Sequence, residues 1–319
     1  EKTLSFQREH SASLRISIVV PAYRTKKEHL EAMLNSVSRQ SYPHWELIVA
    51  DAGGTAESVQ AWAKKNGICL RKAADASNLA EWMDQSIMLC TLSENKGISA
   101  NTNAGIELAA GDAVGLLDHD DLLTANALWE MADCLEKEKK RGKQKLVLFS
   151  DEDKCDKAAS RFYEPNFKPD FDGELLLTNN YICHFTVIET AFLKELKLRS
   201  GFDGAQDYDL MLRAYAAGGQ FVHVPKVLYH WRCHEASTAS NPQSKRYAYE
   251  AGQRALEDYC LRKGWKATVS GLKHLGFYRE DYEDSVFCQR PEIGIWAKPL
   301  PGGRDVFGIR HPKGFLVSG

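Results

Sequence analysis

Residues 111–121 read GDAVGLLDHDD, a short apolar run that leads directly into aspartates. The apolar part is typical of an interior strand of a parallel sheet. In open α/β sheets, ligands bind beyond the carboxyl ends of the strands, where Asp118 and Asp120 would lie. On an extended backbone these carboxylates share a face and repel one another unless a cation joins them. The pattern predicts either a divalent-metal site for a diphosphate or a helix N-cap formed by Asp120 or Asp121.

The flanking sequence alternates between strand and helix patterns. Strands are expected at 16–23, 46–51, 68–71, 113–117, 145–150 and 220–224, and helices at 28–40, 56–66, Glu81–Leu92, 97–110, 124–141, 206–217 and 245–263. Residues 161–180, rich in Phe, Tyr, Pro and Asn, predict a semi-irregular surface segment. This alternation predicts an α/β fold with a mixed, mainly parallel sheet flanked by helices.

Composition excludes several classes of protein. The formal charge of the 319 residues is -2, so no global basic field exists to hold nucleic acid. No run approaches the ~18 apolar residues of a membrane span, and residues 1–15 lack a signal-peptide core. Eight cysteines without CxxC spacing predict free thiols in a reducing cytosol. The chain begins with Glu1 rather than Met, which leaves open that it is a fragment.

The absence of two common nucleotide-binding motifs limits the classes of enzyme to which the chain can belong. Neither a Walker A loop nor a GxGxxG fingerprint occurs, which disfavours ATPases and ordinary dinucleotide-dependent dehydrogenases. A nucleotide-binding sheet that holds its diphosphate through a carboxylate-bound metal remains, and that arrangement suits nucleotide-sugar chemistry. Such a reaction needs a base, and Asp207 at the start of the helix at 206–217 is the candidate. The alternative is that Asp207 caps that helix and that Asp209 serves only its dipole.

Two residues near the end of the last predicted strand have open roles. His230 follows an apolar run and either completes the metal shell or touches a phosphate. The simpler alternative is a half-buried imidazole in an aromatic cluster with Tyr229 and Trp231. Arg232 either clamps a phosphate or lies with its head group at the surface.

At this point the chain resembles the family 2 glycosyltransferases of GT-A fold, in the bacterial branch of O-antigen and cell-surface polysaccharide assembly. The resemblance extends over about residues 15–280. The matching segments are ISIVVPAY (16–23), SVSRQSYPHWEL (36–47), NKG (95–97), NAG (103–105), LDHDD (117–121), SDEDK (150–154), NNYICH (179–184), QDYDL (206–210) and LYHWR (228–232).

The resemblance implies roles for the matching residues. Asp118 and Asp120 look like the DXD motif that holds Mn²⁺ or Mg²⁺, with Asp120 the more direct ligand, and His230 looks like a further ligand of the metal or the diphosphate. Asp207 looks like the catalytic base. The expected donor-binding residues are Pro21, Ala22, Tyr23, Asp51, Asn103, Asp118 and Arg232.

The resemblance also implies the reaction and its setting. We expect a metal-dependent, inverting transfer of a sugar from a UDP- or dTDP-sugar to a hydroxyl of a glycan or lipid-linked saccharide. The expected location is the cytoplasm, with peripheral association at the inner face of the cell membrane left open. The family usually has a second aspartate where this chain has Ala52, which leaves the nucleobase undetermined.

The expected division of the chain is an N-terminal extension at 1–14, a GT-A domain at 15–284 and a weakly ordered tail at 285–319. Two other functions remain open. A sugar nucleotidyltransferase would carry a glycine-rich loop after the first strand, and residues 24–27 contain no glycine. A non-catalytic glycan-binding relic would have lost its catalytic aspartates, and both Asp120 and Asp207 are present.

Overall fold

The computed structural model describes residues 14–73, 83–233, 246–283, 294–299, 305–310 and 316–318. The helices are α2 (Lys27–Ser38), α3 (Ala56–Asn66), α4 (Ile98–Leu108), α5 (Ala127–Lys140), α6 (Gly173–Thr178), α7 (Thr190–Leu196), α8 (Gln206–Ala216) and α9 (Arg246–Arg262), with a short 3₁₀ turn, η2 (Ser200–Phe202). The main sheet contains β1 (Ile16–Ala22), β2 (Trp45–Asp51), β3 (Cys69–Lys72), β4 (Ser86–Thr91), β5 (Ala113–Leu116), β6 (Leu122–Leu123), β7 (Leu146–Cys155), β8 (Phe162–Asn166), β9 (Thr186–Glu189) and β10 (Gln220–Arg232).

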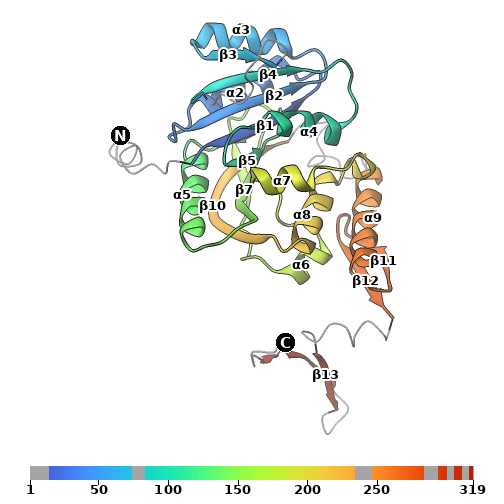
Figure 1. Cartoon of the computed structure of the whole chain (residues 1–319). Helices are drawn as coiled ribbons and strands as arrows, with labels where there is room; N and C mark the ends of the chain where they lie inside the picture. Colours follow the sequence, from blue (N-terminus) through green and yellow to red (C-terminus); the bar gives the residue numbers. More distant parts are fainter. Residues whose placement is uncertain are drawn as a thin grey trace.

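The N-terminal half of the main sheet is entirely parallel, with strand order β3-β4-β2-β1-β5. Its strands lie side by side in the blue and teal part of the chain, with α3 beyond β3 and β4 (Figure 1). Because the strands run in one direction, their carboxyl ends share one edge of the sheet. The loop that begins at Leu117 therefore starts at the same edge as the segments after Ala22 and Asp51.

The second half of the sheet is mixed. β9 pairs antiparallel with both β5 and β7, and β10 then pairs parallel with β7. The short strand β6 adds antiparallel to the far end of β10, and β8 pairs with the second half of β7. The predicted α/β fold with a mixed, mainly parallel sheet is confirmed by this order.

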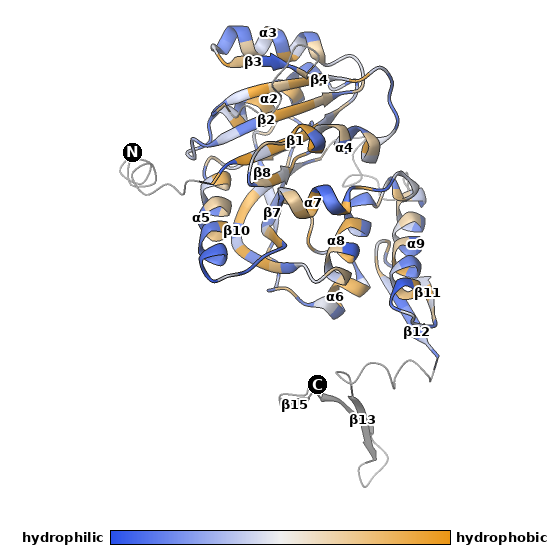
Figure 2. Ribbon diagram, viewed as in Figure 1, coloured by the Kyte–Doolittle hydropathy of each residue, from blue (hydrophilic) through white to orange (hydrophobic). Residues whose placement is uncertain are grey.

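The core consists of two layers, one on each face of the sheet. Successive residues of β1 point to opposite faces of the sheet. Ile18 belongs to the buried cluster that contains residues of α2, α3 and α5, and Val19 belongs to the one that contains residues of α4, α8 and α9. Figure 2 shows the hydrophobic colour concentrated on the central strands and hydrophilic colour on the outer side of α3 and α9. Burying one such aliphatic side chain contributes about 1.5–3 kcal/mol.

One sequence-based prediction is wrong. The segment Glu81–Leu92 was expected to be a helix, and its described part instead contains the parallel strand β4. Its apolar residues Ile87, Met88 and Leu89 are consecutive and all buried between neighbouring strands and two layers of helices. Periodicity alone does not separate such a short apolar run from a buried helix, and the run's length favours a strand.

The remaining predicted elements are found within a few residues, with some additions. The irregular segment 161–180 contains β8 and α6. The strand at 145–150 extends to Cys155, and the strand at 220–224 continues to Arg232. The two helix-capping alternatives are not realised, because Asn126 precedes α5 and Ala205 precedes α8 at the N-cap positions.

After α9 the chain forms two small separate sheets. One is the antiparallel hairpin of β11 (Ala267–Gly271) and β12 (Tyr278–Tyr282). The other is the antiparallel sheet of β13 (Gly294–Pro299), β14 (Asp305–Arg310) and β15 (Leu316–Ser318). These strands lie in the tail, which was expected to be extended or poorly ordered chain; its intervening residues, like residues 1–13, lie outside the described part. Among the described helices, none has the length and apolar character needed to cross a bilayer.

Candidate active site

A cavity of about 970 Å³ opens at the carboxyl edge of the main sheet. Segments far apart in the sequence converge on it: the end of β1, the loop after β5, the middle of β7, the loop before β9 and the start of α8. Its size lies within the range of small-molecule sites. The residues that line it are Pro21, Ile98, Asp118, His119, Asp120, Asp121, Glu152, Asn166, Asn179, Asn180, Tyr181, Cys183, His184, Asp203, Gly204, Gln206, Asp207, Trp231, Tyr247 and Phe277.

The aspartate loop forms one wall of this cavity. Asp118, Asp120 and Asp121 all line it, and Asp121, which is buried, accepts a hydrogen bond from Tyr229 Oη at 2.5 Å. Burial raises the pKa of Asp118, and repulsion from Asp120 adds to the rise. The Asp118 side chain stays 42% exposed toward the cavity, which limits the loss of hydration. Two crowded carboxylates with oxygen donors fit a hard divalent cation.

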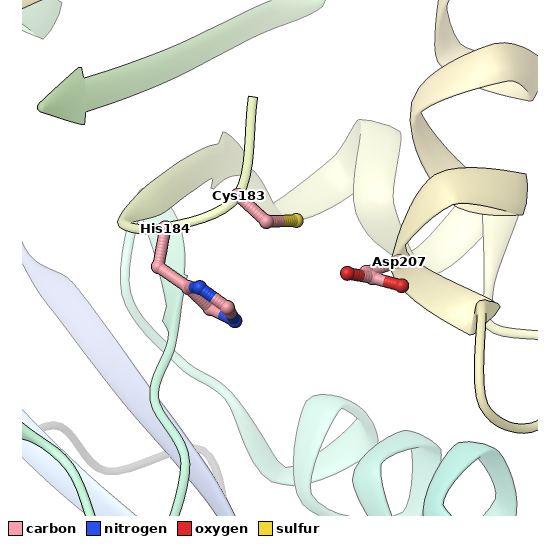
Figure 3. Close-up of side chains that lie close together, drawn as sticks. All are labelled: Cys183, His184 and Asp207. Carbon is pink, nitrogen blue, oxygen red and sulfur yellow. The ribbon is translucent and has the colours of Figure 1, made fainter. Parts of the chain in front are cut away.

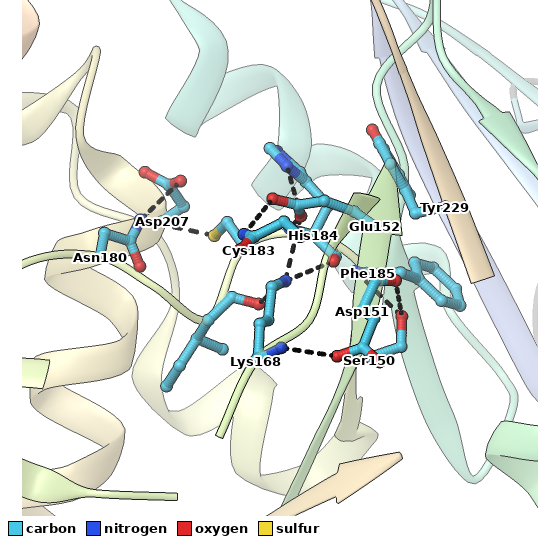
Figure 4. A network of polar contacts seen from close by, with 12 residues as sticks. Ser150, Asp151, Glu152, Lys168, Asn180, Cys183, His184, Phe185, Asp207 and Tyr229 are labelled. Carbon is cyan, nitrogen blue, oxygen red and sulfur yellow. Dashed lines mark hydrogen bonds and ion pairs between the residues drawn. The ribbon is translucent and has the colours of Figure 1, made fainter. Parts of the chain in front are cut away.

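Asp207 faces the same cavity from the first turn of α8. Asn180 Nδ2 donates a hydrogen bond to Asp207 Oδ2 at 3.0 Å and another to Cys183 Sγ at 3.4 Å (Figure 4). Ala205 occupies the N-cap position, so Asp207 is free of a capping role. Asp209, in contrast, is buried and paired with Arg199 and Arg213. The Asp209 carboxylate therefore has a structural role.

A buried lysine fixes the loop that carries Cys183 and His184. Lys168 Nζ donates hydrogen bonds to the carbonyl oxygens of Ile182 at 2.9 Å and His184 at 2.7 Å, and to Glu152 Oε2 at 3.0 Å (Figure 4). All three ammonium protons are thereby used, and the side chain is only 1% exposed. Burial lowers the pKa of Lys168, and Glu152 opposes this shift. Glu152 also accepts a hydrogen bond from the His184 backbone N–H.

Cys183, His184 and Asp207 form a compact cluster beside the aspartate loop (Figure 3). Their donor atoms, one from each side chain, all lie within 4.8 Å of one another. The His184 ring stacks on Tyr229 with 4.8 Å between centroids, and its Nε2 lies 3.9 Å from Asp118 Oδ2. Burial raises the pKa of the Cys183 thiol well above its ordinary value.

His230 and Arg232 do not line the cavity. His230 Nδ1 lies 2.5 Å from Asp153 Oδ1, and its ring packs on Phe162. Side chains alternate along β10, and the neighbouring Trp231 faces the cavity and His184. The structure therefore does not bring His230 to Asp118 and Asp120.

Arg232 holds the aspartate loop from behind. It is buried, and its guanidinium donates hydrogen bonds to the carbonyl oxygens of Asp120 at 2.5 Å and Lys157 at 2.6 Å. Its backbone N–H donates to Asp121 Oδ1 at 2.7 Å. Because Arg232 is buried, it is not a surface cation, and its contact with a phosphate stays a prediction. The buried guanidinium thus links the aspartate loop to the segment at Lys157, and we call this link the clasp.

The predicted nucleoside-binding residues lie at the ends of β1 and β2. Pro21 lines the cavity, Ala22 is buried, and the Tyr23 side chain is 40% exposed. Asp51 is buried and accepts hydrogen bonds from the backbone N–H groups of the following turn, which it holds in place. Asn103 exchanges two hydrogen bonds with the backbone of Leu198 and thereby ties α4 to the chain after α7.

Several cavity residues were not predicted as site residues from the sequence. Asn180, Cys183 and His184 were noted only as part of the matching segment at 179–184, and Glu152 only within the acidic run after residue 150. Asp203 was not identified at all; it accepts a hydrogen bond from the Ser99 backbone N–H at the start of α4. Its partner is about a hundred residues away, and no local pattern reports such a contact.

The amino-acid sequence has clear relatives. A model of the family described as "Glycosyl transferase family 2" matches residues 17–196. The chain is 36% identical over 255 residues to "Uncharacterized protein y4gI" of Sinorhizobium fredii, covering 79% of this chain and 26% of that protein. It is 34% identical over 256 residues to "O-antigen biosynthesis protein RfbC" of Myxococcus xanthus, covering 80% and 19%. The chain thus spans about a quarter or a fifth of these relatives.

A shorter relative is matched over most of its length. "Amylovoran biosynthesis glycosyltransferase AmsB" of Erwinia amylovora is 27% identical over 231 residues, which are 68% of this chain and 70% of that protein. Among solved structures, residues 1-349 of S. aureus TarS in complex with UDP-GlcNAc align with a TM-score of 0.57 and 20% identity, over 78% of this chain and 67% of that one. This likeness supports the fold.

Proposed function

Because the chain belongs to glycosyl transferase family 2 and has the GT-A fold, we propose that its cavity transfers a sugar with inversion from a nucleoside-diphosphate sugar to a saccharide hydroxyl. The observation that carries this proposal is the convergence of Asp118, Asp120 and Asp207 on one cavity. The donor is a UDP- or dTDP-sugar, whose nucleoside lies over the ends of β1 and β2 near Pro21 and Tyr23.

Asp118 and Asp120 would hold a divalent cation, Mn²⁺ or Mg²⁺, which supplies neutralisation of the charge on the departing diphosphate. Their oxygen donors and mutual repulsion support this role. His230 is left out of the proposed ligand set because its ring is paired with Asp153. The clasp made by Arg232 holds the aspartate loop in position for the cation.

Asp207 accepts the proton of the acceptor hydroxyl as that oxygen attacks the anomeric carbon from the face opposite the diphosphate. The hydrogen bond from Asn180 orients the carboxylate toward the cavity. A single displacement of this kind inverts the configuration at the anomeric carbon. In this proposal Asp118 and Asp120 act on the leaving group through the cation, and Asp207 acts on the nucleophile.

The acceptor is proposed to be a glycan or lipid-linked saccharide of a cell-surface polysaccharide. The names of RfbC and AmsB, which refer to O-antigen and amylovoran biosynthesis, support this class. The proposed site of action is the cytoplasmic side of the cell membrane, where nucleotide sugars are available. Membership of a glycosyltransferase family sets the sugar nucleotidyltransferase alternative aside.

The exchange Asp207→Asn tests the proposal. It keeps the size of the side chain and its bond from Asn180 but removes the proton acceptor, so turnover should fall by about 10²–10⁴. Transfer and donor hydrolysis are measured with a panel of UDP- and dTDP-sugars and Mn²⁺, and donor affinity by calorimetry.

The matched control is Asp133→Asn, the same exchange on α5, where Asp133 pairs with Lys137 in the next turn. Its turnover should equal that of the parent. Normal turnover in Asp207→Asn combined with a lower melting temperature would mean that Asp207 is structural. Loss of donor binding in this variant would mean that Asp207 also helps to bind the donor. Absence of turnover in the parent with every donor would favour the glycan-binding relic.

A further inference from the structure

The cluster of Cys183, His184 and Asp207 offers a different set of donor atoms from the aspartate loop. It presents one sulfur, one nitrogen and one carboxylate oxygen within 4.8 Å of one another (Figure 3). Mg²⁺ and Mn²⁺ prefer oxygen ligands, whereas thiolate together with imidazole favours Zn²⁺. The two neighbouring donor sets therefore suit different cations.

The three donors are already held by their surroundings. Asn180 Nδ2 donates to Asp207 Oδ2 at 3.0 Å and lies 3.4 Å from Cys183 Sγ, so one amide orients two of the donors. The His184 ring is stacked against Tyr229, and among the described residues its buried Nδ1 has no hydrogen-bond partner. The contacts from Asn180 and Tyr229 hold these side chains in place, as contacts behind metal ligands commonly do.

The backbone around these side chains is fixed as well. Lys168 binds the carbonyl oxygens of Ile182 and His184, on either side of Cys183. The loop therefore offers its donors from a rigid base, and the cavity gives an ion a path from solvent.

We infer that Cys183, His184 and Asp207 form a zinc site, with three protein ligands and a fourth position open to the cavity. Tetrahedral bonds of about 2.0–2.3 Å place ligand atoms roughly 3.3–3.8 Å apart, so any two donors that lie as far apart as 4.8 Å must approach by about 1 Å or somewhat more. Side-chain rotation at the cavity surface provides this movement. As the sulfur–zinc bond forms, the Cys183 thiol releases its proton to solvent.

Zinc at this site would silence the transferase. The proposed base, Asp207, would use its oxygen lone pair for the metal and could not accept the acceptor proton. This consequence rests on the proposed function, whereas binding of the ion does not. Inhibition should therefore track zinc occupancy and should not be relieved by excess Mn²⁺, which occupies the oxygen donors of Asp118 and Asp120.

The first experiment measures binding directly on the full chain without a histidine tag. Co²⁺, which substitutes for Zn²⁺, should give a thiolate-to-cobalt charge-transfer band, and Zn²⁺ should abolish it by displacement. Cys183→Ser should lose the band and bind Zn²⁺ about 100-fold or more weakly, since the thiolate is the ligand that favours zinc. The control Cys134→Ser removes a half-buried thiol on α5, outside the cavity, and should change neither measurement.

A second experiment avoids any loss of folding in the variant. In the parent protein, alkylation of each cysteine is measured by mass spectrometry. Saturating Zn²⁺ should protect Cys183 from alkylation and leave the alkylation rate of Cys134 unchanged. The inference is overturned by a cobalt spectrum without a thiolate band, by equal zinc affinity in Cys183→Ser and Cys134→Ser, or by equal alkylation of Cys183 with and without zinc.

The two proposals fail in distinguishable ways. Zinc binding through Cys183 in a protein that transfers no sugar from any donor would leave the zinc site standing and remove the proposed function. Normal Mn²⁺-dependent transfer that zinc does not inhibit, together with no cobalt–thiolate band, would remove the zinc site alone.

Discussion

Arg232 carries a charge yet is buried, and the hydrogen bonds of its guanidinium go to backbone carbonyl oxygens rather than to a carboxylate. The donors of a planar guanidinium are held in a fixed fork, and here they reach carbonyl oxygens in two different segments at once. One of those carbonyls belongs to Asp120, so the arginine controls the position of the aspartate loop.

The exchange Arg232→Lys separates the clasp from a phosphate ligand. Lysine keeps the charge but loses the fork, so at least one buried carbonyl would be left without a donor, and stability should fall by about 2–4 kcal/mol. Urea unfolding measures this loss. Unchanged stability with much weaker binding of UDP and Mn²⁺ would instead support direct contact with the phosphates.

Asp120 is the residue whose removal should affect metal binding and not folding. We expect Asp120→Ala to abolish nucleotide-dependent Mn²⁺ binding while the melting temperature stays equal or rises, because the exchange relieves repulsion on Asp118. Its backbone carbonyl remains available to Arg232. Activity of the parent should vanish in EDTA and return with Mn²⁺ or Mg²⁺.

The contrasting variant is Asp121→Asn. The buried carboxylate of Asp121 accepts hydrogen bonds from Tyr229 Oη and from the Arg232 backbone N–H. This exchange should lower the melting temperature, which Asp120→Ala should not. Full turnover of the parent in EDTA would contradict the metal prediction.

At the scale of residues, sequence patterns located the side chains that follow strands and the one that begins a helix. Asp118, Asp120 and Asp207 could be found because each stands beside a strong local signal. His184 could not, because its position depends on Lys168 and Glu152, which come from other segments. His230 was assigned to the metal from its place in a motif, and strand alternation directs it elsewhere.

Gly97 marks the point where α4 begins beside the cavity. Its φ is +94°, and a Cβ there would overlap Asp203 Oδ2. Asp203 in turn accepts from the Ser99 N–H at the start of the helix. A side chain at position 97 would therefore disturb both the backbone and the helix start.

We expect Gly97→Ala to destabilise the protein by about 2–4 kcal/mol, the sum of a strained backbone and a steric clash. Gly67→Ala is the matched control, since Gly67 also has positive φ, at +66°, but has nothing within 4 Å of a Cβ. It should cost only about 1 kcal/mol. Equal losses in thermal unfolding would show that the contact with Asp203 has no energetic weight.

At the scale of elements, the alternation of strands and helices was predictable wherever a clear period extended over a whole element. The α3 helix matched its expected range of 56–66, and β1 and β2 lay within a residue or so of theirs. β4 was mistaken for a helix because all its central residues are buried, so no polar face distinguishes the two. β9 was missed because its antiparallel place between β5 and β7 depends on distant partners.

The division of the whole chain is open to a deletion test. The tail forms its own three-stranded sheet, and every recorded pairing of β13, β14 and β15 is within that sheet. We therefore predict that deleting 286–319 leaves the melting temperature of the catalytic domain and donor hydrolysis unchanged. Limited proteolysis should cut the parent after about Glu283. Insoluble or unfolded protein after the deletion would show that the tail belongs to the core.

The placement of β9 also has a consequence for how the chain is made. β5 ends at Leu116 and its partner begins at Thr186, so one edge of β5 has no neighbour until roughly 70 further residues leave the ribosome. At about 5–20 residues per second this takes on the order of 4–14 s. During that time the nascent protein presents an open strand edge, which is a template for pairing with another chain. Lower growth temperatures or a holding chaperone should therefore raise the yield of native enzyme more than substitutions that stabilise the folded protein.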